Sequence, residues 1–222
     1  MIRVVIADDH QILREGLKQL LDTAGDIEVV GEAADGSETL ERVRNETFDV
    51  LVLDLSMPGR SGMDLIRQVV DERPRLRMLV LSMHHEQQYA VRAIRAGAAG
   101  YLTKETASSD LVAAIRKVAA GGAYITPAVA EQLALDAMPG SRPSTHETLS
   151  DREFDVFRLL VAGESVGTIA DRLNLSSKTI STHKARLMEK LGVASTADLV
   201  RYAMRHRLFD EPGTSNGTDS TS

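Results

Sequence analysis

The sequence predicts two domains: an α/β domain built on a doubly wound, parallel, five-stranded sheet, and then an all-α domain that contains a helix-turn-helix. Three observations support this prediction. Over residues 1–125, short apolar runs alternate with amphipathic helical patterns, whereas beyond residue 149 the pattern is helical only. A segment rich in proline, glycine and small polar residues lies between the two. The chain of 222 residues is long for one compact domain and sufficient for two.

Five apolar runs are expected to form the strands of the sheet. Runs that are apolar throughout are typical of strands covered on both faces. In chain order, the predicted strands contain residues 4–6, 29–30, 50–53, 78–81 and 101–102. Helices are expected between and after them, because apolar residues recur there at helical spacing. These residues are Ile12, Leu13, Leu17, Leu20 and Leu21; Leu40 and Val43; Leu65, Ile66, Val69 and Val70; Val91 and Ile94; and Leu111, Val112, Ile115 and Val118.

Residues 126–148 are expected to link the two domains, and residues 210–222 to form a disordered tail that contains no large apolar side chain. Charge is distributed unevenly along the chain. Residues 1–125 carry a net charge of −4, whereas residues 149–209 carry +3. A positive module in an acidic protein suggests a polyanionic partner for that module alone, although so small an excess also fits ordinary variation.

The composition excludes several classes of protein. The chain contains no cysteine, which excludes disulfides and thiolate metal sites. The N-terminal residues lack the layout of a signal peptide, and no apolar segment approaches the ~20 residues needed to span a bilayer. We therefore expect a soluble, cytoplasmic protein that does not engage a membrane.

Polar side chains follow four of the predicted strands. Asp8 and Asp9 follow the first strand, Asp54 the third, Ser82 the fourth and Lys104 the fifth. In a parallel sheet, groups beyond the carboxyl ends of the strands converge on one edge. Three neighbouring carboxylates repel each other, and Mg²⁺, which prefers oxygen ligands, would offset that repulsion. A carboxylate beside Mg²⁺, a hydroxyl and an ammonium group is placed to attack a phosphoryl donor.

Each of these residues alone has an ordinary explanation. The Asp8-Asp9 pair could favour the N-terminal dipole of the next helix, Ser82 could be a loop hydroxyl, and Lys104 could be a solvated charge. The joint pattern, on four strands in order, is more specific than any one of its members.

The first 125 residues resemble the receiver domain of response regulators, which has a flavodoxin-like fold. The resemblance implies that Asp54 is the phosphoacceptor and that a sensor histidine kinase supplies the phosphoryl group. The matching blocks are IADDHQILREGL (6–17), DVLVLDLSMPGRSGMDL (49–65), LVLS (79–82) and AGAAGYLTKE (96–105).

The same resemblance implies roles for the surrounding residues. Mg²⁺ would be bound by Asp9, Asp54 and the carbonyl group of Ser56, with Asp8 acting mostly through water. Lys104 would pair with the phosphate, Ser82 and Tyr101 would form the conformational switch, and Pro58 and Gly62 match the turn after the phosphorylation site. One position departs from many receivers: Glu105, and not proline, follows Lys104, so that the low cost of a cis bond before proline does not apply.

Four helices are expected within residues 149–209. Ser150 and Glu153 form a capping box at the start of the first helix, which Gly163 ends. Ser165 caps the second helix, and Ser176 caps the third, which runs to about residue 191. The fourth spans roughly residues 195–205. Two short helices joined by a tight turn follow the helix-turn-helix plan.

The third predicted helix carries the candidate DNA contacts. Ile180, Leu187 and Leu191 lie on one side and are expected to face the core, while basic and small polar residues lie elsewhere. Such residues can contact phosphates and base edges, although a solvated helix face would also explain the charges alone. The candidates are Lys178, Thr179, Ser181, Thr182, Lys184, Ala185 and Arg186.

Residues 149–203 resemble the LuxR-type helix-turn-helix of NarL/FixJ-type response regulators along their whole length. The most specific part reads SxKTIxTHxxRLMxKLGV, from Ser176 to Val193. Gly167 and Ser181 stand where basic residues are common in this family, which implies fewer phosphate contacts than usual.

These observations together predict a two-component response regulator rather than an enzyme, in which phosphorylation of Asp54 controls sequence-specific binding to promoter DNA and so transcription. An aspartyl-phosphate hydrolase is one alternative, but its nucleophile follows the first strand in an Asp-x-Asp pattern, and it gives the helical domain no role. A regulator that works without phosphorylation is another alternative, and the complete acidic, hydroxyl and lysine set disfavours it.

A homodimer is expected on phosphorylation or on DNA, because a symmetric pair reads two half-sites. The fourth helix could supply a contact through Leu199, Val200 and Ala203, or these residues could fill the core of their own domain. For the receivers, the family resemblance leaves two faces open: the first and fifth helices, or the face beyond Tyr101.

Overall fold

The computed structural model describes residues 1–57, 62–83, 87–138, 145–206 and 208–209. Several expectations fall outside these residues, namely the turn at Pro58, the middle of the linker and the tail from residue 210 onward. Within the described ranges, no helix has the length and apolar character needed to cross a bilayer.

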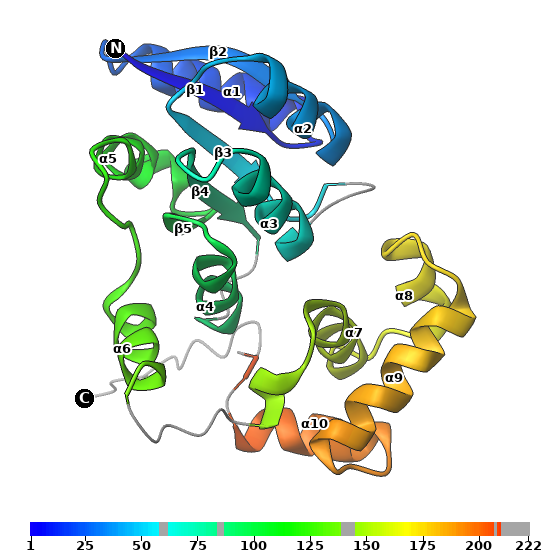
Figure 1. Ribbon diagram of the computed structural model, residues 1–222. Coiled ribbons are helices and arrows are strands. Elements are labelled where there is room, and N and C mark those ends of the chain that lie inside the picture. The colour runs from blue at the N-terminus through cyan, green and yellow to red at the C-terminus, as the bar shows by residue number, and fades with distance from the viewer. Residues whose placement is uncertain (58–61, 84–86, 139–144, 207, 210–222) are drawn as a thin grey trace, which may run out of the picture.

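The N-terminal domain contains the predicted parallel sheet, with strands in the order β2-β1-β3-β4-β5 (Figure 1). All four strand pairs are parallel. The elements are β1 (Ile2–Ala7), α1 (Gln11–Asp22), β2 (Ile27–Ala33), α2 (Gly36–Asn45), β3 (Val50–Asp54), α3 (Gly62–Glu72), β4 (Arg77–Ser82), α4 (Gln87–Ala96), β5 (Gly100–Thr103) and α5 (Ala107–Ala119). The predicted α/β fold, with its five strands and the helices between them, is confirmed.

Successive side chains of each strand point to opposite faces of the sheet, so the apolar core has one part on each face. Val4 and Ile6 pack with apolar residues of α1 and α5, whereas Val5 and Ala7 pack with those of α2, α3 and α4. All four of these strand residues are buried, because helices cover both faces.

The C-terminal domain contains the predicted helices: α7 (Asp151–Val161), α8 (Val166–Arg172), α9 (Ser177–Leu191) and α10 (Thr196–Arg205). The capping box of Ser150 and Glu153 is present. Gly163 follows α7 with a φ of +85°, and Asn174 forms the tight turn between α8 and α9 with a φ of +52°. These left-handed residues turn the chain sharply, so that α8 and α9 form a helix-turn-helix.

The linker contains a helix that the sequence analysis did not predict, α6 (Pro127–Asp136). The Thr126 hydroxyl caps it by accepting a hydrogen bond from Val129 N at 3.3 Å. Val129 is buried in the core, and α6 packs on α4. A single-turn 3-10 helix, η1 (Thr145–Thr148), precedes α7.

The two domains are docked through α4 and α7, which lie next to each other in Figure 1. Tyr89 of α4 is buried, and its ring contacts that of Phe154 of α7 edge to face, 5.3 Å between centroids. Its hydroxyl group donates a hydrogen bond to Asp155 Oδ1 (2.9 Å) and accepts one from Arg158 Nε (3.1 Å). The apolar cluster beneath α2, α3 and α4 therefore continues into the core of the C-terminal domain.

Arg92, one turn further along α4, makes several contacts to the C-terminal part of the chain. Its guanidinium group donates to the carbonyl oxygens of His146 and Leu149 and to Asp151 Oδ1, each at 3.0 Å. It also lies 4.1 Å from the centre of the Phe154 ring. The Arg92 side chain is only 10% exposed, so these interactions are sheltered from solvent.

We predict that Arg92→Ala weakens domain docking by roughly 2–4 kcal/mol, because two carbonyl groups and Asp151 lose a charged donor. Small-angle scattering should show a larger radius of gyration, and hydrogen exchange should rise in α4 and α7. Arg116→Ala, which removes an exposed ion pair with Asp26 within the N-terminal domain, should leave both measurements unchanged. A compact Arg92→Ala protein with unchanged exchange would contradict this role.

Candidate functional site

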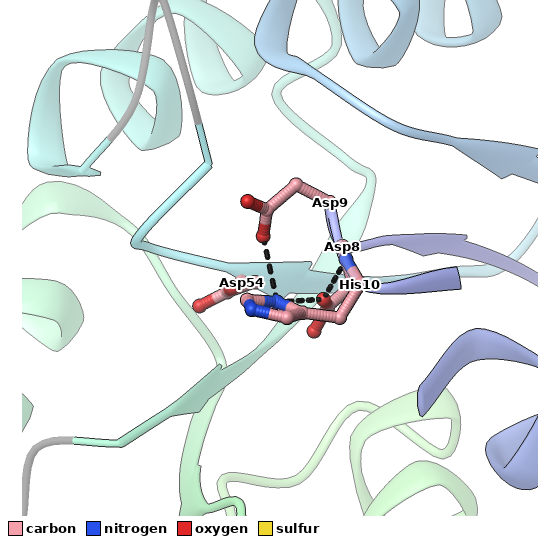
Figure 2. A group of neighbouring side chains, drawn as sticks. All are labelled: Asp8, Asp9, His10 and Asp54. Atoms are coloured by element: carbon pink, nitrogen blue, oxygen red, sulfur yellow. Dashed lines mark hydrogen bonds and ion pairs between the residues drawn. The ribbon is translucent and has the colours of Figure 1, made fainter. Parts of the chain in front are cut away.

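The predicted acidic groups meet where the strand order of the sheet reverses. The chain runs outward from β1 to β2 on one side and from β3 to β5 on the other, so that β1 and β3 are neighbours in the middle of the sheet. Asp8 follows β1 directly, and Asp54 is the last residue of β3, one position beyond the Ala7–Leu53 pair. Figure 2 shows Asp8, Asp9 and Asp54 side by side at this point, which is the usual ligand position of such sheets.

Lys104 joins the two buried carboxylates. Its ammonium group lies 2.7 Å from Asp8 Oδ2 and 2.8 Å from Asp54 Oδ2. The other Asp54 oxygen accepts a hydrogen bond from Ser56 N at 3.0 Å. Asp8 and Asp54 are almost fully buried, at 2% and 1% exposure, so their charges depend on these partners.

Burial and charge pairing act in opposite directions on Asp54. Burial raises the pKa of this carboxyl group, while the ammonium group of Lys104 and the backbone N–H of Ser56 lower it, and burial prevails. For Lys104, burial lowers the pKa, but the hydrogen bonds to Asp54 and Asp8 outweigh it and raise the pKa overall. The raised pKa keeps Lys104 protonated, and its ammonium group favours the ionised form of the Asp54 side chain.

The donor set fits a hard divalent cation. One ligand atom each from Asp8, Asp9, His10 and Asp54 lies within 4.8 Å of the others. Asp9 is exposed at the mouth of the site, whereas Asp8 and Asp54 lie at its base. Carboxylate oxygens around a space of this size are ligands that suit Mg²⁺. Ser56, whose carbonyl group is the fourth expected ligand, is exposed next to the site.

The expected switch residues lie on the strands next to the site. Ser82 is fully buried at the end of β4, and its carbonyl oxygen accepts a hydrogen bond from Lys104 N at 2.8 Å. Tyr101, on β5, is 8% exposed, and its backbone N–H donates to Tyr124 O at 2.9 Å. The peptide bond between Lys104 and Glu105 is trans. Ser82 and Lys104 are therefore linked through the backbone beside Asp54.

A cleft of about 410 Å³ opens beside the acidic site, between the two domains. The N-terminal domain lines it with Asp9, Ser56 and Tyr89 among others, and the C-terminal domain with residues that include Arg152 and Arg158. The docked C-terminal domain thus forms one wall of the approach to the acidic site.

The candidate DNA contacts lie on α9, which packs on α7, α8 and η1. In Figure 1, α9 lies on the side of α7 that is remote from the N-terminal domain. Ile180 and Leu187 are fully buried and Leu191 is 7% exposed, as predicted for the core side. Lys178, Ser181, Thr182, Ala185 and Arg186 are exposed, and Thr179 and Lys184 are half-buried. Docking of α7 therefore leaves this surface of α9 open.

The position of α10 decides between the two explanations of its apolar residues. Leu199 and Ala203 are buried at 0% and 2% exposure in the core of their own domain, so the core-filling alternative holds for both. Val200 is half-buried, and Met204, four residues later on the same face, is 62% exposed. The apolar surface that α10 presents is therefore formed by Val200 and Met204, and not by the expected set of Leu199, Val200 and Ala203.

Three functionally placed residues were missed by the sequence analysis. His10 lies in the acidic cluster, and its position directly after Asp8-Asp9 could have indicated this. Tyr89 and Arg92 form the docking surface. They are three residues apart on a helix whose other buried residues are mostly alanines, a spacing that places both on one face.

Comparisons with known proteins agree with this geometry. Residues 4–116 match the family model described as the response regulator receiver domain, and residues 147–203 match that of the luxR family of bacterial regulatory proteins. The chain belongs to the response regulators, with an N-terminal receiver domain and a C-terminal LuxR-type DNA-binding domain.

The chain matches its relatives over nearly their whole length. The response regulator GacA of Pseudomonas viridiflava is 37% identical over 211 residues, which cover 95% of this chain and 99% of the relative. UvrY of Escherichia coli K12 is 35% identical over 94% of this chain and 96% of its own. A structure of RcsB from Salmonella enterica serovar Typhimurium, bound to the rprA promoter with the phosphomimetic BeF₃⁻, matches with a TM-score of 0.63 and 31% identity, covering 92% of this chain and 99% of that one.

Proposed function

We propose that Asp54 accepts a phosphoryl group from a sensor histidine kinase and that this event controls binding of the LuxR-type domain to promoter DNA. The observation that carries the proposal is the placement of Lys104, whose ammonium group bridges Asp8 and Asp54 at the reversal of strand order. Promoter DNA as the target would place the protein in the cytoplasm. Sequence similarity to regulatory proteins supports a regulatory rather than an enzymatic role.

The chemistry follows from the charges at the site. Asp54 supplies the carboxylate oxygen that attacks phosphorus, and the bond from phosphorus to its donor breaks as the new O–P bond forms. Lys104 holds Asp54 as an anion before the reaction and afterwards balances the added charge. Asp8, Asp9, Asp54 and the Ser56 carbonyl would hold Mg²⁺, which when bound neutralises charge on the phosphoryl oxygens.

Docking through α4 offers a path from Asp54 to the DNA-binding domain. Ser82 ends β4, and α4 follows it in the chain with Tyr89 and Arg92 on its docking face. A phosphoryl group on Asp54 that repositions Ser82 and Tyr101 would move α4 against α7. The group can shift docking only by as much as it favours one arrangement over the other.

The open surface of α9 supports DNA binding in the major groove. Lys178, Lys184 and Arg186 would contact phosphates, and Thr182 and Ala185 would lie nearer the base edges, with Thr179 and Ser181 beside them. RcsB, a relative of known structure, is described as two dimers bound to two parallel DNAs.

By analogy we propose that this chain also binds DNA as a homodimer and that phosphorylation favours the pair. The face of α10 with Val200 and Met204 would join the DNA-binding domains. For the receivers, α6 packs on α4, and α7 contacts it through Tyr89 and Arg92 in the docked form, which favours α1 and α5 as the shared face.

Asp54→Asn is predicted to abolish phosphorylation, because Asp54 is the one aspartate in the described part of the chain with the lysine, the acidic cluster and the Ser56 amide arranged around its oxygens. Incubation with acetyl phosphate and Mg²⁺ followed by intact-mass measurement should show one phosphoryl group on the wild type, and none after removal of Mg²⁺. Asp22→Asn, which alters an exposed aspartate of α1, serves as the control. Wild-type uptake by Asp54→Asn would overturn the assignment.

Substitutions on α9 should separate affinity from sequence preference. Lys184→Ala or Arg186→Ala is predicted to weaken binding to all duplexes and to lower the slope of log K against log salt by about 1. Thr182 or Ala185 substitutions should instead cost about 1–3 kcal/mol on the preferred site and relax its sequence. Arg75→Ala, which removes an exposed positive charge between α3 and β4, is the control. Uniform loss on every sequence for all four variants would contradict the division of roles.

Met204→Glu is predicted to weaken dimerisation of the phosphorylated protein at least tenfold, because it places a charge on the proposed α10 contact. Sedimentation at several concentrations, with and without DNA, measures this. Leu135→Glu adds a charge at an exposed apolar position of α6 and should have little effect. A phosphorylated wild type that stays monomeric both free and on its operator would exclude dimerisation altogether.

A further inference from the structure

His146 is a buried histidine at the end of the linker. It lies on η1, directly before α7, and is only 5% exposed. Its ring packs against α10, where the ring centroids of Tyr202 and His206 lie 6.1 and 5.6 Å away. The Nδ1 atom of His146 lies 3.3 Å from the Tyr202 hydroxyl oxygen, and a neutral imidazole can make this hydrogen bond. The position of η1 therefore depends on the packing of this ring.

The backbone of His146 is also held by the receiver domain. Arg92 of α4 donates a hydrogen bond to the His146 carbonyl oxygen at 3.0 Å and another to the Leu149 carbonyl oxygen at 3.0 Å. A displacement of η1 would move the carbonyl groups that Arg92 binds. Packing of the His146 ring on α10 and docking of the C-terminal domain on α4 are therefore coupled through one turn of backbone.

The groups around His146 disfavour a positive charge on its ring. Arg92 of α4 and the exposed His206 of α10 face the ring, and both oppose its protonation. None of the ion pairs formed among the described residues involves His146, because the nearby carboxylates are bound by other cations. These pairs are Glu147 of η1 with Arg95 of α4, Asp151 of α7 with Arg92, and Glu153 of α7 with Lys190 of α9. A protonated His146 ring would thus be buried next to a cation without a carboxylate of its own.

We propose that protonation of His146 displaces η1 from α10 and thereby releases the C-terminal domain from α4, so that domain docking weakens in acid. A neutral ring keeps its contacts, whereas a protonated ring gains hydration by moving into water, and the carbonyl group that Arg92 binds moves with it. This switch consists of linker and interface residues and needs no phosphoryl group on Asp54. It therefore acts in addition to the proposed control by phosphorylation.

The pH range follows from the pKa of His146 in the docked and released forms. In the docked form, burial and then the charges of His206 and Arg92 lower this pKa from 6.5 to about 4. A released ring in water has the ordinary value, so docking is at full strength above about pH 7 and weakens as the pH falls from about 6.5 to 4. Between pH 7 and pH 5, the docking equilibrium constant should fall by up to about twentyfold. Asp155, at the same interface, acts in the opposite direction, because burial raises its pKa and so favours docking in acid.

Fluorescence energy transfer between the domains of the full-length, unphosphorylated protein tests the proposal. Because the chain contains no cysteine, dyes can be attached through Glu41→Cys on α2 and Glu189→Cys on α9, both at exposed positions. At constant ionic strength, transfer should fall reversibly from pH 7 to pH 5, while far-UV circular dichroism keeps its helical signal. Transfer that is constant or rises in acid, or that is lost together with the helical signal, would overturn the proposal.

Two histidine variants assign the effect to one ring. His146→Gln retains a hydrogen-bonding side chain that does not titrate, so its docking equilibrium constant should change less than about twofold over the same pH range. His206→Gln removes the exposed histidine of the same cluster and is the matched control, in which the fall in transfer should persist. A fall in His146→Gln equal to that of the wild type would refute the role of His146.

Nuclear magnetic resonance of the wild type with isotope-labelled histidine gives a test that does not depend on docking of the His146→Gln variant. The His146 imidazole should remain neutral while transfer is high and gain its proton over the pH range in which transfer is lost. Protonation of His146 without loss of transfer, or loss of transfer while His146 stays neutral, would overturn the proposal.

Discussion

The rest of this structure depends on one electrostatic constraint: two buried carboxylates, Asp8 and Asp54, lie next to each other at the centre of a parallel sheet. Neither could be buried as an anion without a partner, because desolvation and mutual repulsion both oppose it. Lys104, which follows the edge strand β5, is that partner, and its backbone N–H is in turn hydrogen-bonded to the Ser82 carbonyl group. Added negative charge at Asp54 therefore has to be balanced by the same small set of groups, which are connected to β4 and β5.

The docked arrangement places the output domain against the helix that follows β4. Tyr89 and Arg92 of α4 combine an aromatic contact with charged hydrogen bonds, so that this interface tolerates little sliding. A packed interface of this kind has discrete arrangements rather than a continuous range, which suits a signal with two states. The charge that phosphorylation adds would then shift the equilibrium at this interface between docked and released domains.

Much of the fold was predictable because it follows from periodicity. The apolar runs identified the strands, and the caps at Ser150, Ser165 and Ser176 identified helix starts, since these signals are local. The meeting of Asp8 and Asp54 was also predictable, because parallel strands bring their carboxyl ends to one edge.

Other features were not predictable, because they depend on which surfaces meet. Docking of α4 on α7 depends on the pairing of Tyr89 and Arg92 with a helix that is distant in the sequence. The apolar residues of α10 could equally have faced a second copy, and tertiary packing placed Leu199 and Ala203 inside. Helix α6 had a local signal, Thr126 before Pro127, which was outweighed by the loop-like composition further along the linker.

The exposure of α9 in the docked form has a kinetic consequence. A molecule whose recognition helix is accessible before the signal arrives can associate with any duplex through its basic side chains, and can slide and hop along it. The unphosphorylated population would then reside largely on the chromosome. The time to reach a promoter after phosphorylation would reflect a short one-dimensional search from a nearby position, and not diffusion through the whole cell volume.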